Sequence, residues 1–343
     1  MSEKNKKVVT IGGGTGSFML LNGLKNYPIE LSAIVSMADN GGSTGILRDE
    51  LGVLPPGDVR QCLAALSGAS DIMRRLMTYR FEEGGLKGHN FGNLFLSALE
   101  KITGNFSVGV EEAAGILNIK GEVIPVADKQ VNLFMELKNG KLIQGEDEIR
   151  HNFEIKKAGV KKSYLNPKVR ANKKAIQKIL EADLVVIGPG DYYGSIMPNF
   201  LVQGISEALR KTKAVVVFNC NLVNRKGQTD GFTLADYVDL INKQIGKERI
   251  DFATFNTKDP GKNLIKKYEG ESMLVEFGEN KNQKRTYRII KTDLLSDKKA
   301  SYSKADTLAA TRAFIRHDSE KLARVLMVIL ELGKYEGIIN EIV

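Results

Sequence analysis

Short apolar runs followed at once by glycine-rich polar segments recur along this chain. Residues 7–11 (KVVTI) lead into 12–17 (GGGTGS), and residues 183–187 (DLVVI) lead into 188–190 (GPG). Each apolar run is continuous rather than alternating, which indicates a strand buried on both faces of a parallel sheet. Helical periodicity resumes after each glycine-rich segment. This repetition predicts an α/β fold with a Rossmann-like, doubly wound and mostly parallel sheet.

The rest of the chain supplies further elements of the same kind. Strands are expected at 31–38, 214–218 and 251–255, and helices at 18–24, 200–209, 233–245 and 317–332. Residues 56–118 have the apolar periodicity of a helical segment. Residues 121–156 alternate instead, and Asn139-Gly140 marks a hairpin turn, so a small antiparallel β insertion is predicted there. We predict a single domain over 1–343, with a core of about 6–118 and 183–343 and an insertion of about 119–182.

Composition excludes several classes of protein. The chain has 343 residues, of which 42% are hydrophobic, enough for a packed core. Two cysteines, Cys62 and Cys220, cannot build a disulfide framework, and the three histidines have no cysteine pairs beside them to suggest structural zinc. The N-terminal segment lacks the apolar run of a signal peptide, and no stretch of about 18 apolar residues predicts a membrane span. We therefore expect a cytoplasmic protein.

The net charge of +9 comes from one region. Residues 156–178 contain nine lysines and arginines and no acid, so the remainder of the chain is balanced. A basic stripe that binds nucleic acid usually carries stacking aromatic side chains, and this run has only Tyr164. A solvated helix face, or a cavity mouth that attracts an anionic small molecule, fits the run better. We predict no binding of nucleic acid.

Polar segments rich in glycine follow several predicted strands or precede predicted helices. They occupy residues 12–17, 38–45, 55–60, 87–93, 124–128, 188–199 and 227–232. Glycine allows close approach of the backbone, and the Asp, Asn, Ser and Thr side chains supply hydrogen bonds. On a doubly wound sheet such loops meet beyond the carboxyl ends of the strands, where ligands bind. The segments therefore predict a binding site assembled from distant parts of the chain.

The first segment is a candidate phosphate site. Its six residues are Gly12, Gly13, Gly14, Thr15, Gly16 and Ser17. They place backbone N–H groups at the start of a helix, where an anion is stabilised, so we predict that the diphosphate of a nucleotide lies there. Ser17 replaces the third glycine of a dinucleotide fingerprint, and the lysine of a P-loop is missing. A tight strand-to-helix turn is the alternative.

Asp39 and Asn40 end the second predicted strand. A carboxylate with an amide and nearby hydroxyls suits a phosphate together with Mg²⁺, which takes one or two carboxylates beside substrate oxygens. Asp39 is the candidate metal ligand, and Asp39 and Asn40 are the candidate catalytic residues if the protein is active. A simple turn is the alternative. Arg60 is a candidate for binding phosphate or for bridging it to Asp39, whereas Asp58 is interpreted as a helix cap.

Weaker candidates complete the predicted ligand site. They are His89, Asn90, Asn93, Gly188, Gly190, Asp191, Tyr268 and Arg316. Asn90 is equally well explained as a helix cap. Tyr268 fits packing as well as base stacking.

Six of these motifs, in order, resemble the CofD-like superfamily. They are GGGTGS, MADNGGSTG, PPGDVR, GHNFGN, VIPVAD and GPGDYYGSIMPN, and the resemblance spans about residues 7–320. The superfamily contains 2-phospho-L-lactate transferase and a gluconeogenesis factor branch. The segment LGVLPPGDVR and the late RHD triplet (316–318) are more similar to the second branch. Residues 294–311 are longer than the family needs before that triplet.

The resemblance implies a Rossmann-like fold and a nucleotide ligand. Its transferase members use Mg²⁺ and move a phospholactyl group from a guanosine diphosphate carrier to a deazaflavin. The gluconeogenesis factor branch is cytoplasmic, is needed for normal cell shape on gluconeogenic carbon, and is associated with UDP-sugars. The resemblance places Asp39 and Asn40 at metal and phosphates, the 12–17 and 188–191 loops on the nucleotide side, and Tyr268 and Arg316 at a nucleotide sugar.

Three functions remain open at this level. The first is a regulator that binds a nucleotide or nucleotide sugar, with a UDP-sugar favoured and GDP or NAD as alternatives. The second is an Mg²⁺-dependent transferase of a phospholactyl-type group. The third is a redox protein that uses a dinucleotide, or a nucleic-acid binder. A homodimer is expected from the frequency of such assemblies.

Overall fold

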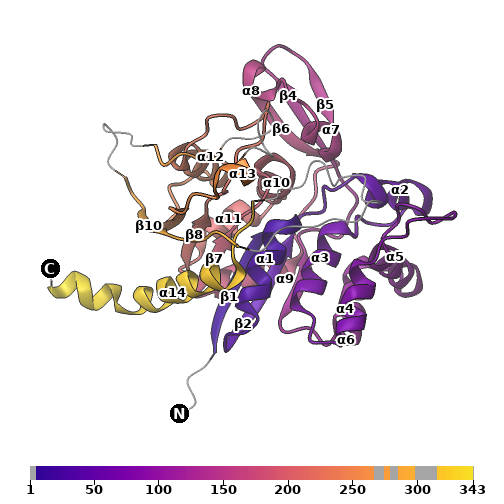
Figure 1. Ribbon diagram of the computed structural model, residues 1–343, viewed down its shortest axis with the longest axis horizontal. Helices are drawn as coiled ribbons and strands as arrows, with labels where there is room; N and C mark the ends of the chain where they lie inside the picture. The colour runs from indigo at the N-terminus through magenta and orange to yellow at the C-terminus, as the bar shows by residue number, and fades with distance from the viewer. Residues whose placement is uncertain (1–4, 266–273, 279–284, 298–314, 343) are drawn as a thin grey trace.

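The computed structural model describes residues 5–265, 274–278, 285–297 and 315–342. Its centre is a seven-stranded sheet in which every neighbouring pair of strands is parallel (Figure 1). Across the sheet the strands are β10 (Arg288–Thr292), β9 (Phe252–Asn256), β8 (Val215–Asn219), β7 (Leu184–Ile187), β1 (Lys6–Gly12), β2 (Ile29–Val35) and β3 (Glu122–Pro125). The predicted α/β, doubly wound parallel sheet is thus confirmed.

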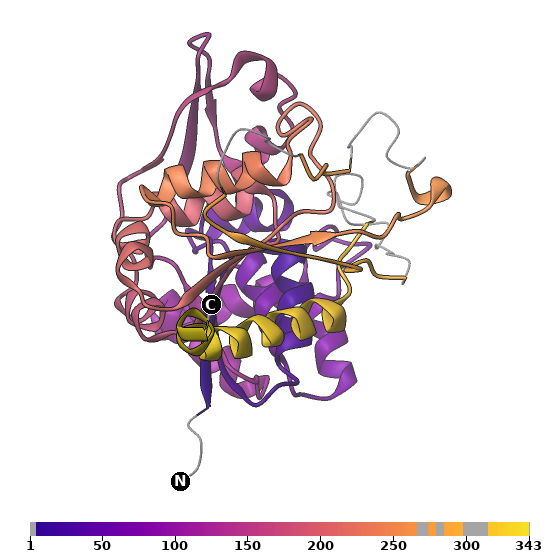
Figure 2. The ribbon, with the colours of Figure 1, turned by 90° about the vertical axis from the view of Figure 1, so that its left-hand side faces the viewer.

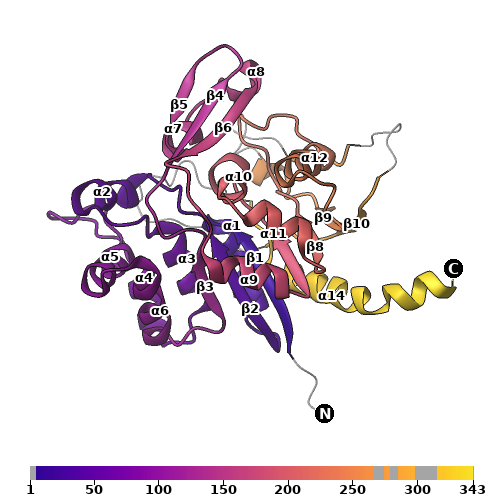
Figure 3. The same cartoon turned by 180° about the vertical axis from the view of Figure 1, so that it is seen from behind.

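Helices cover both faces of this sheet, which is why its central strands are continuously apolar. All four residues of β7 are buried, as are the last five of β1. On one face α1 (Gly14–Leu24) packs between α3 (Gly57–Leu66) and α14 (Ser319–Ile342). On the other, α11 (Ile205–Lys211) packs between α9 (Lys173–Glu181) and α12 (Leu234–Ile245). Figures 1 and 3 show these two layers from opposite sides.

The order of the strands reverses between β1 and β7. From β1 the chain proceeds outward through β2 to β3, and it later returns to β7 and proceeds the other way through β8, β9 and β10. The connections after β1 and β7 therefore leave the sheet on opposite faces and open a crevice at its carboxyl edge. This is where doubly wound sheets bind ligands.

Two further groups of elements flank the crevice. The predicted helical stretch contains α3, α4 (Asp71–Thr78), α5 (Phe91–Thr103) and α6 (Phe106–Ile116), preceded by α2 (Gly42–Leu51). Further short helical segments are the π-helix η1 (Tyr192–Ile196) and the α-helices α10 (Met197–Leu201) and α13 (Lys262–Ile265). In the described part of the chain, no helix combines the length and the apolar character needed to cross a membrane.

A small antiparallel sheet stands at the carboxyl end of the large one (Figure 2). Its central strand β4 (Asn132–Leu137) pairs with β5 (Leu142–Gln144) and β6 (Val160–Asn166), and α7 (Glu146–Arg150) and α8 (Ile155–Ala158) connect those two. Alternate residues of β4 are buried, as the alternating sequence predicts. At the two ends of the 119–182 segment, β3 and α9 belong to the large sheet and its helices, so the small sheet occupies the middle of that segment.

Candidate functional site

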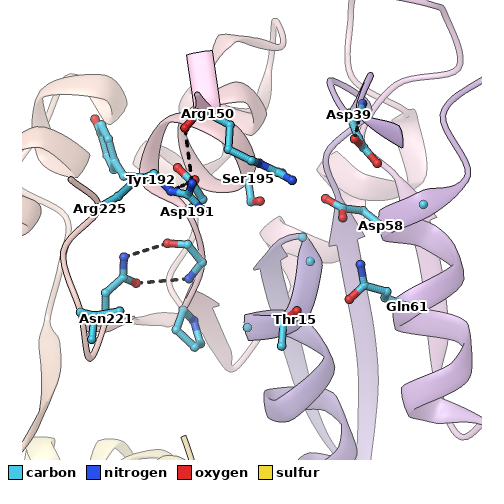
Figure 4. Close-up of a pocket in the computed structure, with 18 of the residues that line it drawn as sticks. Thr15, Asp39, Asp58, Gln61, Arg150, Asp191, Tyr192, Ser195, Asn221 and Arg225 are labelled. Carbon is cyan, nitrogen blue, oxygen red and sulfur yellow. Dashed lines mark hydrogen bonds and ion pairs between the residues drawn. The ribbon is translucent and has the colours of Figure 1, made fainter. Parts of the chain in front are cut away.

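A cavity of about 400 Å³ lies at the carboxyl edge of the sheet, where β1 and β7 diverge. This volume is typical of a small-molecule site. Figure 4 shows Asp39 and Asp58 on one side, and Asp191, Asn221 and Arg225 on the other. Of the residues predicted from sequence, those lining the cavity are Gly13, Gly14, Thr15, Gly16, Asp39, Arg60, Asn93, Gly190, Asp191 and Arg316. The structure thus brings together residues about 300 positions apart.

The loop after β1 leads into α1, and no side chain of the N-cap residue bonds to the N-terminus of this helix. Helix α1 begins at Gly14, and the preceding Gly13 makes no side-chain hydrogen bond to it. The Gly14 N–H instead donates to the carboxylate of Asp58, in the first turn of α3. A methyl group at Gly13 would lie 2.1 Å from Asp58 Oδ2, so any larger residue there would displace this carboxylate. A carboxylate thus sits where we predicted a phosphate.

Asp58 and Asp39 form a pair of carboxylates on one wall of the cavity (Figure 4). Burial and the charge of Asp39 raise the pKa of Asp58 to about 7. Asp39 also accepts the N–H of Gly41 at 3.0 Å, which fixes the turn after β2. Near neutral pH, Asp58 therefore exchanges a proton readily, and the pair attracts a cation in its place.

The two carboxylates fit Mg²⁺ by their chemistry. Among the described residues, no three His, Cys, Asp or Glu side chains gather closely enough to hold a metal ion by themselves. Mg²⁺ does not need such a set, because it keeps waters and takes phosphate oxygens beside one or two carboxylates. Asp39 and Asp58 supply that number of ligands.

The loop after β7 is held by its own side chains and by β8. The Asp191 carboxylate accepts the N–H groups of Tyr193 and Gly194, both at 3.1 Å, and so caps η1. It also pairs with Arg225 Nε at 2.8 Å. The Asn221 amide donates to the Gly190 carbonyl at 2.8 Å and accepts its N–H at 3.2 Å. These contacts satisfy the backbone of Gly190 and the N–H groups of Tyr193 and Gly194.

The insertion contributes a buried cation to the cavity. Glu146 and Arg150, one turn apart on α7, form an ion pair, and Glu146 is only 1% exposed. Burial raises the pKa of Glu146, and the charge of Arg150 opposes this shift. The nearby charges of Glu146, Asp39, Asp191 and Asp58 keep the pKa of Arg150 above its usual value. The Arg150 guanidinium is therefore charged at any physiological pH. It interacts electrostatically with carboxylates from separate loops.

Arg316 and His317 close another side of the cavity. The His317 ring bonds to the backbone of Cys220, and burial lowers the pKa of His317 to about 4. His317 is therefore neutral at pH 7 and presents a polar group without charge.

Other predicted residues lie behind the cavity wall. Asn40 Oδ1 accepts the N–H of Asp147 at 2.9 Å, which anchors α7 to the loop after β2. Asn90 caps α5 by accepting the N–H of Gly92 at 2.9 Å. His89 Nδ1 lies 3.3 Å from the hydroxyl of Ser43. None of these three predicted side chains lines the cavity.

Asn93 links the cavity-lining Arg60 to this network. Arg60 Nε donates to Asn93 Oδ1 at 2.9 Å, and Asn93 in turn donates to Ser43 Oγ at 3.3 Å. Gly12, Ser17 and Gly188 are absent from the lining of the cavity. Tyr268 lies outside the described residues, as do residues 298–311 of the long segment before the RHD triplet.

Several cavity residues were not predicted as ligand-binding residues. They are chiefly Asp58, Arg150, Phe153, Asn221 and Arg225. Asp58 was interpreted as a helix cap. Asn221 and Arg225 follow β8, so the rule that loops after parallel strands bind ligands would have found them. Arg150 and Phe153 belong to the insertion, and no local motif indicates that they approach β7.

Comparisons with known proteins identify the family of this chain. A profile of the family described as "2-phospho-L-lactate transferase CofD" matches residues 8–295. A gluconeogenesis factor from Bacillus subtilis is 37% identical, over 95% of this chain and 98% of its own length. One from Halalkalibacterium halodurans is 42% identical, over 72% of this chain and 76% of its own.

Solved structures have the same fold. A crystal structure of a member of the UPF0052 family from Bacillus halodurans has a TM-score of 0.85 and 35% sequence identity, and the match covers 95% of this chain and all of that one. The family match spans the large sheet from β1 to β10. The chain therefore belongs to the CofD family, and its relatives include proteins named gluconeogenesis factor.

Proposed function

We propose that this protein binds a nucleotide diphosphate or nucleotide sugar in the cavity between β1 and β7, with a UDP-sugar as the favoured ligand. One observation carries the proposal: the glycine-rich loops after two adjacent parallel strands line one cavity at the reversal of strand order. At the N-terminus of α1 the Gly14 N–H donates to Asp58, and the other N–H groups of the first turn would stabilise a phosphate. The branch of gluconeogenesis factors to which the motifs are similar favours a UDP-sugar over GDP or NAD.

Charge supports a role for Mg²⁺ in this binding. Asp39 and Asp58 lie together on one wall of the cavity, whose other charged lining residues are Asp191, Arg60, Arg80, Arg150, Arg225, Lys226 and Arg316. A phosphate placed against the two carboxylates would be repelled, so a cation is needed between them. Asp39 and Asp58 would hold Mg²⁺, which neutralises phosphate oxygens when bound. Arg150 and Arg225 would bind the ligand from the opposite wall.

A transferase activity is the second candidate, and the carboxylate pair favours it. Asp58 has a pKa of about 7 beside the carboxylate of Asp39, as suits a group that accepts a proton from an attacking hydroxyl. The family description names a transferase of 2-phospho-L-lactate. The reaction would transfer a phospholactyl-type group from a nucleotide diphosphate carrier, largely through positioning and charge neutralisation.

In the cell, we place this binding in the regulation of carbon use. Relatives of this chain are named gluconeogenesis factor. A protein that senses a UDP-sugar links carbon supply to envelope synthesis, which accounts for a need in maintaining cell shape on gluconeogenic carbon. Loss of the protein should then deform cells on such carbon sources and not on glucose.

The test begins with what the protein carries from cells. Native mass spectrometry of the purified protein should detect a bound nucleotide. Calorimetric titration with UDP-glucose, GDP and NAD, with and without Mg²⁺, should then show binding that Mg²⁺ strengthens. Arg225→Gln should weaken it at least tenfold, since Arg225 lines the cavity.

A matched control and a clear failure complete the design. Arg74→Gln removes an exposed arginine that also pairs with an aspartate, Asp71, and should leave binding unchanged. Absence of a bound nucleotide, together with no binding of any of the three ligands, would overturn the proposal. Release of a transferred group from the carrier would favour the transferase.

A further inference from the structure

Phe153 is a large aromatic side chain that remains exposed at the cavity. Its side chain is 65% exposed, although it lines the same cavity as the two glycine-rich loops. A single exposed apolar residue is common on protein surfaces and needs no explanation by itself. Here, however, the exposed ring belongs to a backbone that the fold holds firmly in place.

Hydrogen bonds tie the segment around Phe153 to the loop after β8. The buried Gln228, 1% exposed, donates its amide to the carbonyls of Ile149 and Arg150 at 2.6 and 3.0 Å. The Lys156 N–H donates to the Gly227 carbonyl at 2.7 Å. Bonds on both sides of Phe153 thus fix its position along the chain.

Gly227 brings the two backbones into direct contact. It has a φ of +76°, and a methyl group there would lie 2.2 Å from the Cα of Phe153. Only glycine allows this approach. The loop after β8 therefore packs against the Phe153 backbone, while the Phe153 side chain stays 65% exposed.

The surroundings of Phe153 indicate what the ring would meet. Arg150, Arg225 and Lys226 line the same cavity. A fixed, solvent-exposed aromatic ring beside cations suits a ligand that combines a planar ring with phosphates. A nucleotide is such a ligand.

We propose that Phe153 is the stacking platform for the nucleobase of the bound nucleotide. This inference rests on the proposed function and deepens it, because it assigns the base to the insertion and the diphosphate to the loops of the large sheet. A phenyl ring has no hydrogen-bonding group, so Phe153 selects a planar base and does not distinguish uracil from guanine or adenine.

The test compares a ligand that has a base with one that has none. Base stacking on an aromatic side chain contributes about 1–3 kcal/mol, so Phe153→Ala should weaken UDP-glucose binding roughly 5- to 150-fold. Affinity for inorganic pyrophosphate should stay the same, and Phe153→Tyr should retain most UDP-glucose binding. Leu142→Ala is the matched control, since Leu142 is an exposed apolar residue, 52% exposed, of the same insertion outside the cavity.

A fluorescent reporter gives a second readout. The chain has no tryptophan, so Phe153→Trp places a single indole at the proposed platform. Its emission should change on addition of UDP-glucose and not of pyrophosphate, whereas Leu142→Trp should respond to neither.

The outcomes separate this inference from the proposed function. Unchanged UDP-glucose affinity in Phe153→Ala overturns the stacking role, and so does an equal loss of UDP-glucose and pyrophosphate. If the unaltered protein binds no nucleotide, the proposed function fails and the base platform fails with it. Thermal unfolding checks the variant, and Phe153→Ala should keep its midpoint because the ring is exposed.

Discussion

The two glycine-rich loops at the centre of the sheet follow adjacent parallel strands, yet they satisfy their backbones differently. The loop after β7 caps its own helical turn with Asp191, while the loop after β1 has no cap of its own and uses Asp58 from another helix. The β7 loop is thus stabilised by its own side chain, whereas the β1 loop depends on Asp58, a carboxylate whose charge a proton or a bound cation can neutralise.

The largest expected effect is on the self-capped loop. Asp191→Ala removes the cap of η1 and leaves Arg225 without its carboxylate. We expect the free energy of unfolding to fall by about 3 kcal/mol, because a helix cap and a partly buried ion pair are lost together. Urea denaturation measures it. Asp71→Ala, which breaks an exposed pair with Arg74, should lower that free energy by less than about 1 kcal/mol. An equal loss of stability in Asp191→Ala and Asp71→Ala would contradict the structural role of Asp191 in the β7 loop.

The contribution of the β1 loop to stability should depend on pH. The folded protein raises the pKa of Asp58 from 3.8 to about 7, so the folded state binds more protons than the unfolded state between these values. Stability attributable to Asp58 therefore falls as pH rises from 4 to 7. Asp58→Asn should be more stable than the unaltered protein at pH 8 by roughly 2–3 kcal/mol. Unfolding curves at pH 4 and pH 8 test this, and a constant difference contradicts it.

Asp39 should control the cation at the β1 loop. Asp39→Asn removes the charge that helps raise the pKa of Asp58. We expect UDP-glucose binding without Mg²⁺ to change little, and the strengthening by Mg²⁺ to shrink about tenfold, or about 1.4 kcal/mol. Calorimetry with and without Mg²⁺ measures both quantities. Unchanged binding, Mg²⁺ dependence and cellular function would reduce Asp39 to a residue that only shapes the turn.

Substitution of Asn40 tests how strongly α7 of the insertion is anchored to the loop after β2. Asn40→Ala removes the bond to the Asp147 N–H and should lower the free energy of unfolding by about 1 kcal/mol. Asn139→Ala, in the exposed hairpin turn, provides the comparison. A loss of ligand affinity without loss of stability would instead support direct contact between Asn40 and the ligand, as the sequence motif implied.

The smallest effect is expected far from both loops. Lysines of the basic run pair with acids: Lys161 with Glu136 at 2.7 Å, and Lys178 with Glu122 at 3.1 Å. Neutralising Lys161, Lys162, Lys173 and Lys174 together should remove no more than the weak, non-specific RNA binding that any basic surface shows. Electrophoretic shifts over a range of salt concentrations measure it. A steep salt dependence that disappears in the variant would contradict the prediction.

Local patterns were sufficient for most of the fold. Continuous apolar runs predicted β1, β2, β7, β8 and β9, because burial on both faces leaves a signal within a few residues. The start of α2 escaped prediction, since its first residues, Gly42 and Ser43, favour loops. Tertiary contacts support that helix instead: Arg48 donates to the carbonyl of Val131 and to the Asn132 amide.

The sequence predicted only the part of the candidate site that the loops of the large sheet form. Gly13, Gly14 and Asp191 follow strands, so a topological rule placed them at the carboxyl edge. Arg150 and Phe153 reach the cavity because Asn40 and Gln228 hold the insertion against it. Such contacts join positions 78 or more residues apart, and no short motif encodes them.

The central position of β1 also affects how the protein is made on the ribosome. β1 is synthesised before its neighbour β7, which begins at Leu184, so one edge of β1 stays unpaired until more than 170 further residues have been translated. The cavity is completed later still, because His317 lines one side of it. A nascent chain therefore exposes an apolar strand edge of the kind that chaperones protect. Premature termination anywhere before residue 317 would yield a product with an incomplete cavity.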